Sequence, residues 1–268
     1  PDRRIANTII LRQEHRTKHY SQGHRHGGGR KAEMIDELQF PFLSEKDHVI
    51  SLVGGGGKTT LMYNMAAHGA RKGWRVLTAT TTHIQQPPGE VFAQTDADLF
   101  RLWERGSYAV AGTPAPGGKL TAPPQEQLER WMAIADLVLI EADGAKRMPC
   151  KAPAAHEPVL LPQCDIVLAV AGASALEKPL EEVCFRAELA GPLLHVPGNT
   201  LLTPALLAKL LASEAGGRKA VGSRRFYAVI NQVDTDECTA LARQTAELLK
   251  KQYGVPCVLT HFEEGERA

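Results

Sequence analysis

Apolar residues are arranged along the chain in two recurring patterns, short unbroken runs and longer amphipathic stretches. The runs are rich in β-branched residues, as in HVISLV at 48–53, which is typical of buried strands. The amphipathic stretches repeat with the helical period, as in residues 58–73. We expect strands within 48–53, 75–80, 107–112, 136–146, 164–172, 225–234 and 255–260, and helices within 58–73, 96–106, 124–132, 203–213 and 236–254.

The regular alternation of these strands and helices indicates the fold class. It predicts an α/β doubly wound, mostly parallel sheet with helices on both faces. Ligands of such sheets bind beyond the carboxyl ends of the strands. Candidate functional residues follow four of the predicted strands, at 54–60, 80–83, 141–144 and 231–234. We expect a proline-rich insertion near 113–124 and no internal repeat.

A run of glycines joins the first predicted strand to the first predicted helix, in the sequence SLVGGGGKTTL. It matches the phosphate-loop pattern G-x-x-x-x-G-K-[ST] in part, because Leu52 occupies the first glycine position. Its place between a strand and a helix is the one that a phosphate loop requires. Backbone N–H groups of glycines can approach an anion closely, and a helix N-terminus adds unpaired donors. We therefore predict nucleotide binding, rather than a flexible turn, for Gly54, Gly55, Gly56, Gly57, Lys58, Thr59 and Thr60.

Acidic and hydroxyl side chains at the ends of other strands suggest a catalytic Mg²⁺ site. Glu141 and Asp143 follow the apolar run LVLI, and strand alternation would point both to the same side. We predict Lys58, Glu141 and Asp143 as catalytic residues, and Thr59, Asp143 and Thr81 as metal ligands. In this prediction Lys58 binds the β and γ phosphates and Glu141 orients water. The alternatives are a solvated strand end for the acids and simple β-propensity for the threonines.

The sequence INQVD at 230–234 resembles the guanine-reading N-K-x-D element, with Gln232 in place of lysine. A carboxylate there can accept two hydrogen bonds that guanine offers and adenine does not. Asn231 and Asp234 are therefore predicted to bind the nucleotide, GTP slightly over ATP. The alternative is a helix cap at the start of the following helix.

Charge is unevenly distributed along the chain. Residues 1–33 carry eight Lys and Arg against three Asp and Glu, whereas the remainder is mildly acidic. The first segment is poor in apolar residues and cannot offset its ordering entropy by burial. We predict a disordered basic, His-rich extension at 1–33, with Met34 as a candidate natural start, and a single phosphate-loop domain at 34–268. The acidic body argues against a nucleic-acid surface.

Membrane and redox signals are weak in this sequence. We find no apolar run of spanning length and no signal peptide, and we expect no membrane association. The five cysteines show no CxxC spacing. This usage predicts a reduced, cytoplasmic location, with the cysteines structural rather than reactive.

Three motifs taken together, SLVGGGGKTTL, EADGAKRMPCKAPAAHEPV and INQVD, resemble the YqeC family. The resemblance runs from about Met34 to near the C-terminus, and the middle motif is its most specific part. It implies a nucleotide-dependent role in the maturation of selenium-dependent molybdenum hydroxylases. The implied partners are a molybdenum hydroxylase or another cofactor-maturation protein.

The middle motif also predicts a substrate site. Lys146, Arg147 and Lys151 are suited to an anion, and His156 could transfer a proton. The alternative is a loop whose basic residues pair with nearby acids. Three functions remain open: a Mg²⁺-dependent NTP hydrolase, a small-molecule kinase that binds its substrate at 146–158, and a nucleotide-gated scaffold without appreciable catalysis.

Overall fold

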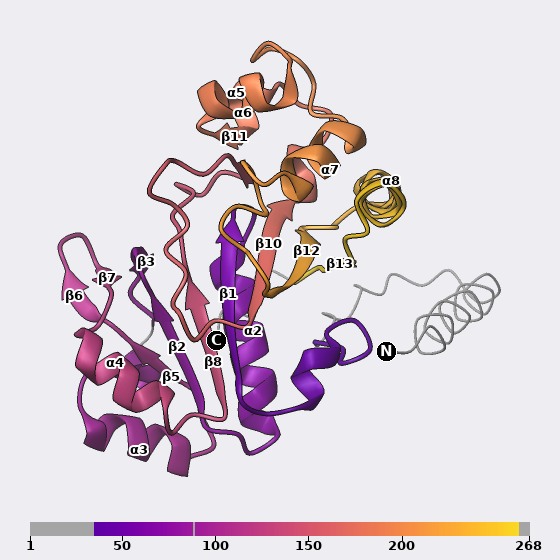
Figure 1. Ribbon diagram of the computed structural model, residues 1–268. Coiled ribbons are helices and arrows are strands. Elements are labelled where there is room, and N and C mark those ends of the chain that lie inside the picture. Colours follow the sequence, from indigo (N-terminus) through magenta and orange to yellow (C-terminus); the bar gives the residue numbers. More distant parts are fainter. Residues whose placement is uncertain (1–34, 88, 263–268) are drawn as a thin grey trace.

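The computed structural model describes residues 35–87 and 89–262, so the extension predicted at 1–33 lies outside the described residues. Its centre is an eight-stranded sheet with the order β13-β12-β10-β1-β8-β2-β5-β4 (Figure 1). Every neighbouring pair in this sheet runs parallel. The predicted α/β, doubly wound class is confirmed, and this sheet is parallel throughout.

Each helix and strand expected from the sequence has a counterpart in the structure. The strands of the central sheet are β1 (His48–Gly54), β2 (Val76–Thr80), β4 (Phe92–Ala93), β5 (Ala109–Ala111), β8 (Leu137–Glu141), β10 (Ile166–Gly172), β12 (Arg225–Asn231) and β13 (Cys257–Leu259). The expected helices are α2 (Lys58–Arg71), α3 (Asp96–Glu104), α4 (Gln125–Met132), α7 (Pro204–Ala212) and α8 (Asp236–Tyr253). Short 3₁₀ turns are η1 (Pro41–Ser44), η2 (Gly89–Val91) and η3 (Ala173–Ala175).

Side chains of the sheet alternate between two apolar layers, as the two-residue period of a strand requires. On one face Leu52 packs with Leu61 and Met65 of α2. On the other face Ile140 packs with Trp131 of α4 and with residues of α3. The helices α7 and α8 cover that second face near β10 and β12. The central strands are therefore buried on both sides, which explains their continuous apolar sequences.

The segment between β8 and α7 contains elements that the hydrophobic pattern did not predict. Two-residue strands β9 (Cys150–Lys151) and β11 (Cys184–Phe185) pair in parallel, and α5 (Leu180–Val183) and α6 (Ala187–Leu194) are short. Figure 1 shows α5, α6 and β11 beyond the carboxyl end of β10. They lie at the edge of the sheet where ligands are expected.

The predicted proline-rich insertion forms part of a small separate sheet. Strands β3 (His83–Gln85), β7 (Lys119–Thr121) and β6 (Thr113–Ala115) pair antiparallel in that order. This sheet continues directly from the end of β2, so it flanks the threonines that follow that strand.

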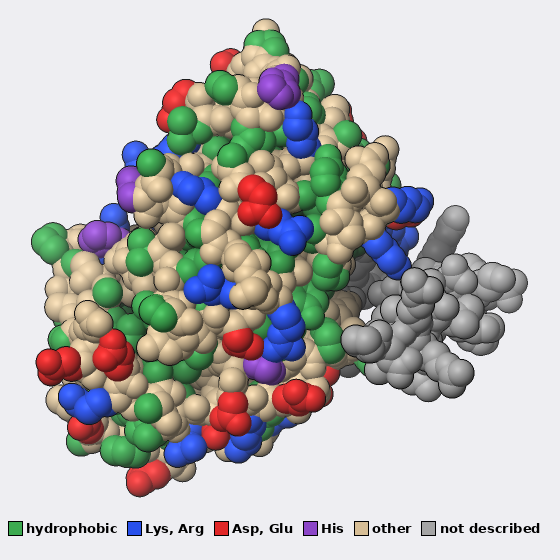
Figure 2. All heavy atoms as spheres, viewed as in Figure 1, with side chains coloured by type: hydrophobic (Ala, Val, Ile, Leu, Met, Phe, Trp, Pro, Cys, Tyr) green, Lys and Arg blue, Asp and Glu red, His purple; other side chains and the backbone are tan. Residues whose placement is uncertain are grey.

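Surface charge is mixed on the face seen in Figure 2. Lys and Arg side chains are interspersed there with apolar and neutral groups, and Asp and Glu gather toward its lower edge. On this face of the described chain, the basic side chains do not merge into one continuous patch. No helix in the described ranges has the length and apolar character needed to cross a membrane.

Candidate functional site

The glycine loop is shorter than the strict phosphate-loop pattern would make it. Leu52, at the first glycine position of that pattern, is fully buried within β1, and the strand continues to Gly54. Helix α2 begins at Lys58, so only three glycines link the strand to the helix. The backbone therefore turns tightly between the carboxyl end of β1 and the start of α2.

Steric contacts show why this turn consists of glycines. A Cβ atom on Gly54 would lie 2.3 Å from the Val170 carbonyl oxygen, and one on Gly56 would lie 2.0 Å from the Gly172 nitrogen. Gly54 and Gly56 also have φ values of +96° and +68°, which favour glycine. The loop therefore packs tightly against the carboxyl end of β10.

The first N–H group of helix α2 that donates to a carbonyl of the preceding turn is that of Leu61, which donates to the Gly57 carbonyl. The N–H groups of Gly54, Gly55 and Gly56 already donate to Asp143 and to the Val170 and Met148 carbonyls, so the donors left for an anion are those of the first helical turn.

Four predicted residues converge beside this loop. The Lys58 ammonium, whose side chain is 4% exposed, lies 3.2 Å from Asp143 Oδ1 and 3.6 Å from Glu141 Oε1. It also donates to the Gly54 carbonyl at 2.6 Å. The Thr59 hydroxyl donates to Glu141 Oε2 at 2.6 Å. The loop lysine, the helix hydroxyl and both strand-end acids therefore form one buried cluster.

The Asp143 carboxylate is held as an anion would be held in a phosphate loop. The Gly54 N–H donates to both of its oxygens, at 3.1 and 3.0 Å. Lys58 and Lys151 approach it from two sides, with Lys151 Nζ at 3.0 Å from Oδ2. The donor set of carboxylates and a hydroxyl suits Mg²⁺, which takes one or two protein oxygens together with phosphate oxygens. The residues present therefore fit a Mg²⁺–nucleotide complex.

The environment of Glu141 shifts the pKa of its carboxyl. Burial raises the pKa of its carboxyl above the usual range, and the charge of Asp143 adds to this effect. Lys58 and the Thr59 hydroxyl act in the opposite direction without cancelling it. A buried carboxyl with a raised pKa is a stronger proton acceptor when ionised, which suits a general base.

The threonines after β2 lie next to Glu141 but bind carbonyl groups. The Thr80 hydroxyl donates to the Glu141 carbonyl at 3.0 Å. The Thr81 N–H donates to the same carbonyl at 3.1 Å, while its hydroxyl donates to the Val159 carbonyl at 3.1 Å. Thr81 is thus near the cluster, with its hydroxyl turned to the segment after β8.

The two predicted base-reading residues have different surroundings. Asn231 is buried behind the loop, where its amide donates to the Gly56 carbonyl at 3.0 Å and accepts from the Thr260 hydroxyl. Asp234 is half exposed and pairs with His261 at 2.5 Å. The cap of α8 is the next residue, Thr235, whose hydroxyl accepts from the Cys238 N–H. Asp234 is therefore not the side chain that caps this helix.

The predicted substrate residues divide into exposed and buried groups. Lys146, Arg147 and His156 are exposed, and the two basic residues have φ values of +47° and +64°. Lys151 is 1% exposed and lies between two carboxylates, Asp143 at 3.0 Å and Glu157 at 2.7 Å. It connects the substrate segment to the phosphate loop.

Two residues that we did not single out from the sequence complete this cluster. The Arg186 guanidinium donates to Glu157 Oε2 at 2.6 Å and to Oε1 at 3.4 Å. Burial would raise the pKa of Glu157, but the hydrogen bond and charge of Lys151, with Arg186, hold it below the usual range. Glu157 was visible in the HEP sequence, whereas Arg186 carried no signal because its partner lies 29 positions away.

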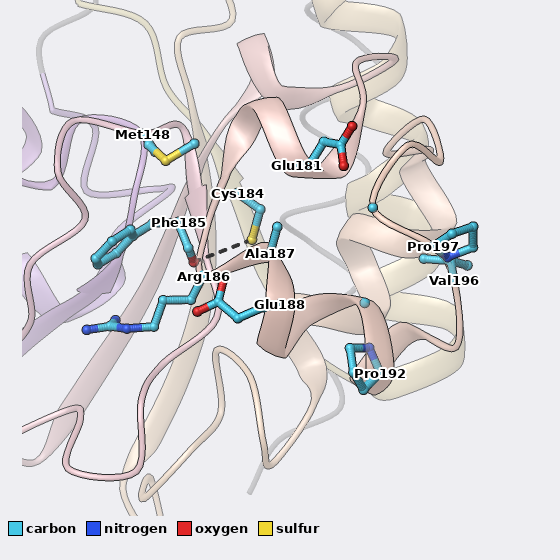
Figure 3. A pocket seen from close by; sticks show the side chains of 12 residues that line it. Met148, Glu181, Cys184, Phe185, Arg186, Ala187, Glu188, Pro192, Val196 and Pro197 are labelled. Atoms are coloured by element: carbon cyan, nitrogen blue, oxygen red, sulfur yellow. Dashed lines mark hydrogen bonds between the residues drawn. The ribbon is translucent and has the colours of Figure 1, made fainter.

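An open groove of about 720 Å³ lies on the α6 side of this cluster (Figure 3). Its lining includes Met148, Phe185 and Arg186 at one end and Pro192 and Pro197 at the other. The Met148 carbonyl accepts a hydrogen bond from the Gly56 N–H at 3.0 Å. Met148 therefore lines the groove and also contacts the phosphate loop through its backbone carbonyl.

The cysteines near this site are poorly suited to act as nucleophiles. Cys150 faces Cys184 across the β9–β11 pair, and this neighbour, together with burial, raises the Cys150 pKa well above its usual value. Burial likewise raises the pKa of Cys164. All five cysteines are free thiols. A raised pKa keeps a thiol protonated and unreactive.

Comparisons with known proteins identify the family of this chain. The model of the YqeC protein family matches residues 50–188, which include the phosphate loop, both acids and the Glu157–Arg186 pair. The protein named "Uncharacterized protein YqeC" from Escherichia coli (strain K12) is 36% identical over 144 residues. That match covers 48% of this chain and 53% of the relative, so the chain spans about half the length of this curated relative.

Among solved structures, the crystal structure of the hydrogenase maturation factor HypB from Archaeoglobus fulgidus matches with a TM-score of 0.38 and 12% identity. The alignment covers 80% of this chain and 82% of that protein. The family model spans more than half of the chain and includes every residue of the ion cluster. The chain belongs to the YqeC family.

Proposed function

We propose that this protein binds a nucleoside triphosphate with Mg²⁺ at residues 54–60 and hydrolyses it. The observation that carries this proposal is the meeting of Lys58, Thr59, Glu141 and Asp143 beside a glycine turn at a helix N-terminus. These groups are the ones that a phosphoryl-transfer site needs: a cation for phosphate oxygens, oxygen ligands for a metal and a carboxylate to position water.

Each residue has a role that follows from its place in the cluster, and Lys58 and Thr81 exchange present contacts for it. Lys58 leaves Asp143 and the Gly54 carbonyl to bind the β and γ phosphates. Thr59 and Asp143 would hold Mg²⁺, and Thr81 would join them once its hydroxyl leaves the Val159 carbonyl. Bound Mg²⁺ neutralises charge that develops on the phosphate oxygens. Glu141 accepts a proton from the attacking water, aided by its raised pKa.

We assign base preference to Asp234 and support of the loop to Asn231. The exposed Asp234 carboxylate can accept hydrogen bonds from N1–H and the 2-amino group of guanine, which favours GTP over ATP. Asn231 acts behind the loop, through its bond to the Gly56 carbonyl. The process served by this step is the one implied by the YqeC resemblance, maturation of a selenium- or molybdenum-containing hydroxylase.

A phosphotransferase is the second candidate, because the groove shares the Met148 wall with the phosphate loop. A substrate bound there would lie near the γ-phosphate, and Lys146, Arg147 and His156 have exposed side chains that could reach an anionic substrate. The two candidates differ in one observable. A hydrolase releases phosphate with no acceptor present, whereas a kinase consumes nucleotide rapidly only with its substrate.

The test is calorimetric titration of the full chain with non-hydrolysable GTP and ATP analogues, with Mg²⁺ and with a chelator, followed by phosphate-release assays with GTP and ATP. We expect Mg²⁺-dependent binding, with the GTP analogue at least about tenfold tighter, or ~1.4 kcal/mol. Lys58→Ala should weaken binding and lower turnover by roughly 10²–10³, since it removes a charge aimed at the transferring group.

Two further variants keep this test decisive. Lys46→Ala removes an exposed lysine that pairs with Asp136 and should leave binding unchanged. Thr59→Val removes the hydroxyl without changing charge, and should reduce the Mg²⁺ dependence even if Lys58→Ala folds poorly. Unchanged binding and turnover in both Lys58→Ala and Thr59→Val would refute the site. Binding without phosphate release would leave the nucleotide-gated scaffold and the phosphotransferase, which only an added acceptor substrate separates.

A further inference from the structure

We propose that the groove beside α6 binds a ligand with one anionic group and a flat aromatic portion, and that nucleotide at the phosphate loop strengthens this binding. The groove chemistry stands on its own contacts, whereas the coupling rests on the proposed nucleotide site. The path of the coupling is Asp143–Lys151–Glu157–Arg186.

The ligand class follows from one end of the groove. Three cations surround the Phe185 ring: Arg186 Cζ lies 4.3 Å from its centroid, Lys146 Nζ 5.2 Å and Lys151 Nζ 5.8 Å. Figure 3 shows the Phe185 ring and the Arg186 guanidinium pointing to the same side, away from Pro192 and Pro197. A guanidinium beside an aromatic face can bind an anion while a flat ring stacks next to it.

The remaining lining limits the charge of the ligand. Met148 and the two prolines provide apolar contact, while Glu181 and Glu188 place carboxylates along the groove. These carboxylates would repel a ligand that is anionic along its length. A single charged group at the Phe185 end, joined to an uncharged ring, matches this distribution.

The backbone also favours a binding role for this corner. Lys146 and Arg186 both have positive φ, +47° and +63°, although neither is glycine. Such conformations cost of order 1–3 kcal/mol each and persist where the surrounding structure enforces them, often at ligand sites. Here they bring side chains from two distant segments to the same aromatic ring.

The coupling arises because two cations share one carboxylate oxygen atom of Glu157. Glu157 Oε2 accepts from Lys151 at 2.7 Å and from Arg186 at 2.6 Å. Lys151 divides its charge between Glu157 and Asp143, and Asp143 is also bound by Lys58 and the Gly54 N–H. A change at the phosphate loop therefore alters how strongly Lys151 competes with Arg186.

The direction of the coupling can be worked out from these contacts. Bound phosphates would draw Lys58 away from Asp143, and Asp143 would then be available to hold Mg²⁺ together with Thr59. Lys151 then keeps Glu157 as its remaining carboxylate partner and competes more strongly for Oε2. Arg186 is loosened and becomes available to the ligand. Linkage requires that the ligand strengthen nucleotide binding by the same factor.

The probe for the groove is 1-naphthyl phosphate, which joins one anionic group to a flat ring. We would titrate it calorimetrically into the full chain, with 1-naphthol and inorganic phosphate as partial probes. We expect 1-naphthyl phosphate to bind at least tenfold more tightly than either. A saturating Mg²⁺–GTP analogue, which also occupies the phosphate loop, should raise the affinity of the probe about fivefold, the lower end of typical couplings.

Matched variants locate the probe. Arg186→Met should abolish probe binding, and Lys146→Met, at an exposed position, should weaken it severalfold without risk to folding. Arg218→Met is the control, since Arg218 also pairs with a glutamate and lies 5.7 Å from the centroid of the Phe226 ring, outside the groove. Glu157→Gln should bind the probe tightly without nucleotide and respond no further to nucleotide.

The outcomes separate this inference from the proposed function. If Lys58→Ala loses nucleotide but still binds the probe through Arg186, both proposals survive. If the wild-type chain binds no nucleotide while Arg186→Met loses the probe, the proposed function fails with the coupling, and the groove site stands. If the probe binds Arg186→Met and Lys146→Met as it binds wild type, or if nucleotide binds the wild-type chain and leaves the affinity for the probe unchanged, the inference is overturned.

Discussion

Two glutamates at the carboxyl edge of the sheet have equally buried side chains, each 8% exposed, yet their pKa values shift in opposite directions. For Glu141, burial dominates and raises the pKa, because Lys58 lies 3.6 Å away and is shared with Asp143. Burial acts on Glu157 as well, but two cations within 2.7 Å outweigh it and lower the pKa. Although the two side chains expose the same fraction of their surface, Glu141 is surrounded by more protein and Glu157 by more cations, so depth of burial and the number of nearby cations together decide the behaviour of each carboxyl.

This difference separates a cluster ready for a ligand from one that is already satisfied. Around the phosphate loop, two carboxylates share Lys58, so an added Mg²⁺ would meet a local excess of negative charge. Around Glu157 one carboxylate faces two cations, so its charge is fully compensated within hydrogen-bonding distance. We therefore expect removal of charge to have opposite effects on stability at the two glutamates. Asp143, which belongs to both clusters, should be the most sensitive position.

Asp143→Asn should break both clusters and give the largest effect. It leaves Lys58 and Lys151 buried with one carboxylate fewer, and loss of one partner of a buried pair typically costs 3–5 kcal/mol. We expect the free energy of unfolding to fall by about 4 kcal/mol, measured by urea denaturation at neutral pH, and Mg²⁺-dependent nucleotide binding to be lost.

The matched control is Asp165→Asn, because Asp165 pairs with His48 and Arg225 at a more exposed site. It should lose far less stability. Equal losses in the two variants would mean that Asp143 is an ordinary ion-pair partner rather than the junction of two buried clusters.

Glu157→Gln should break the compensated cluster alone. We expect a loss of about 3 kcal/mol at neutral pH, since two buried cations lose a common partner. Because the folded pKa lies below the usual 4.5, Glu157 contributes stability above that pH, and the contribution is lost as pH falls through the folded pKa. The difference between wild type and variant in urea denaturation should therefore vanish in acid. Glu247→Gln, in an exposed pair with Lys251, should change little at any pH.

Much of the phosphate-loop cluster could be predicted from the sequence because its members follow strands of regular pattern. Glu141 ends a buried apolar run, and Lys58 and Thr59 follow the glycines, so parallel strand ends bring them together. Most strands of the main sheet, and the helices that cover it, were predictable for the same reason, whereas the two-residue edge strand β4 was not predicted. Leu52 was the exception to the motif, and the structure explains it: β1 continues through that position and leaves a shorter turn.

The groove cluster could not be predicted because its pairing depends on packing between distant segments. Arg186 follows a two-residue strand and has a left-handed backbone conformation. Neither feature produces a hydrophobic pattern that the sequence could reveal. Lys151 was predicted as a residue for an anionic substrate, and its ammonium lies between two carboxylates of the chain itself. Sequence pattern identifies the ends of strands, whereas the partners of a buried charge are set by tertiary contacts.

Glu141→Gln tests the other side of the comparison between the two glutamates. Of the three variants it should have the smallest effect on stability, and it should stabilise the protein where the other two destabilise it. Because burial raises the folded pKa above 4.5, ionisation of Glu141 lowers stability as pH rises through that range. The uncharged variant escapes this loss, so it should be more stable than wild type at neutral pH by about 1 kcal/mol, a typical gain when a functional group is neutralised. The gain should disappear below about pH 4.5 in urea denaturation, while phosphate release falls by roughly 10² or more. A variant that is less stable than wild type at neutral pH would place Glu141 in the same class as Glu157 and remove the basis for treating it as the base.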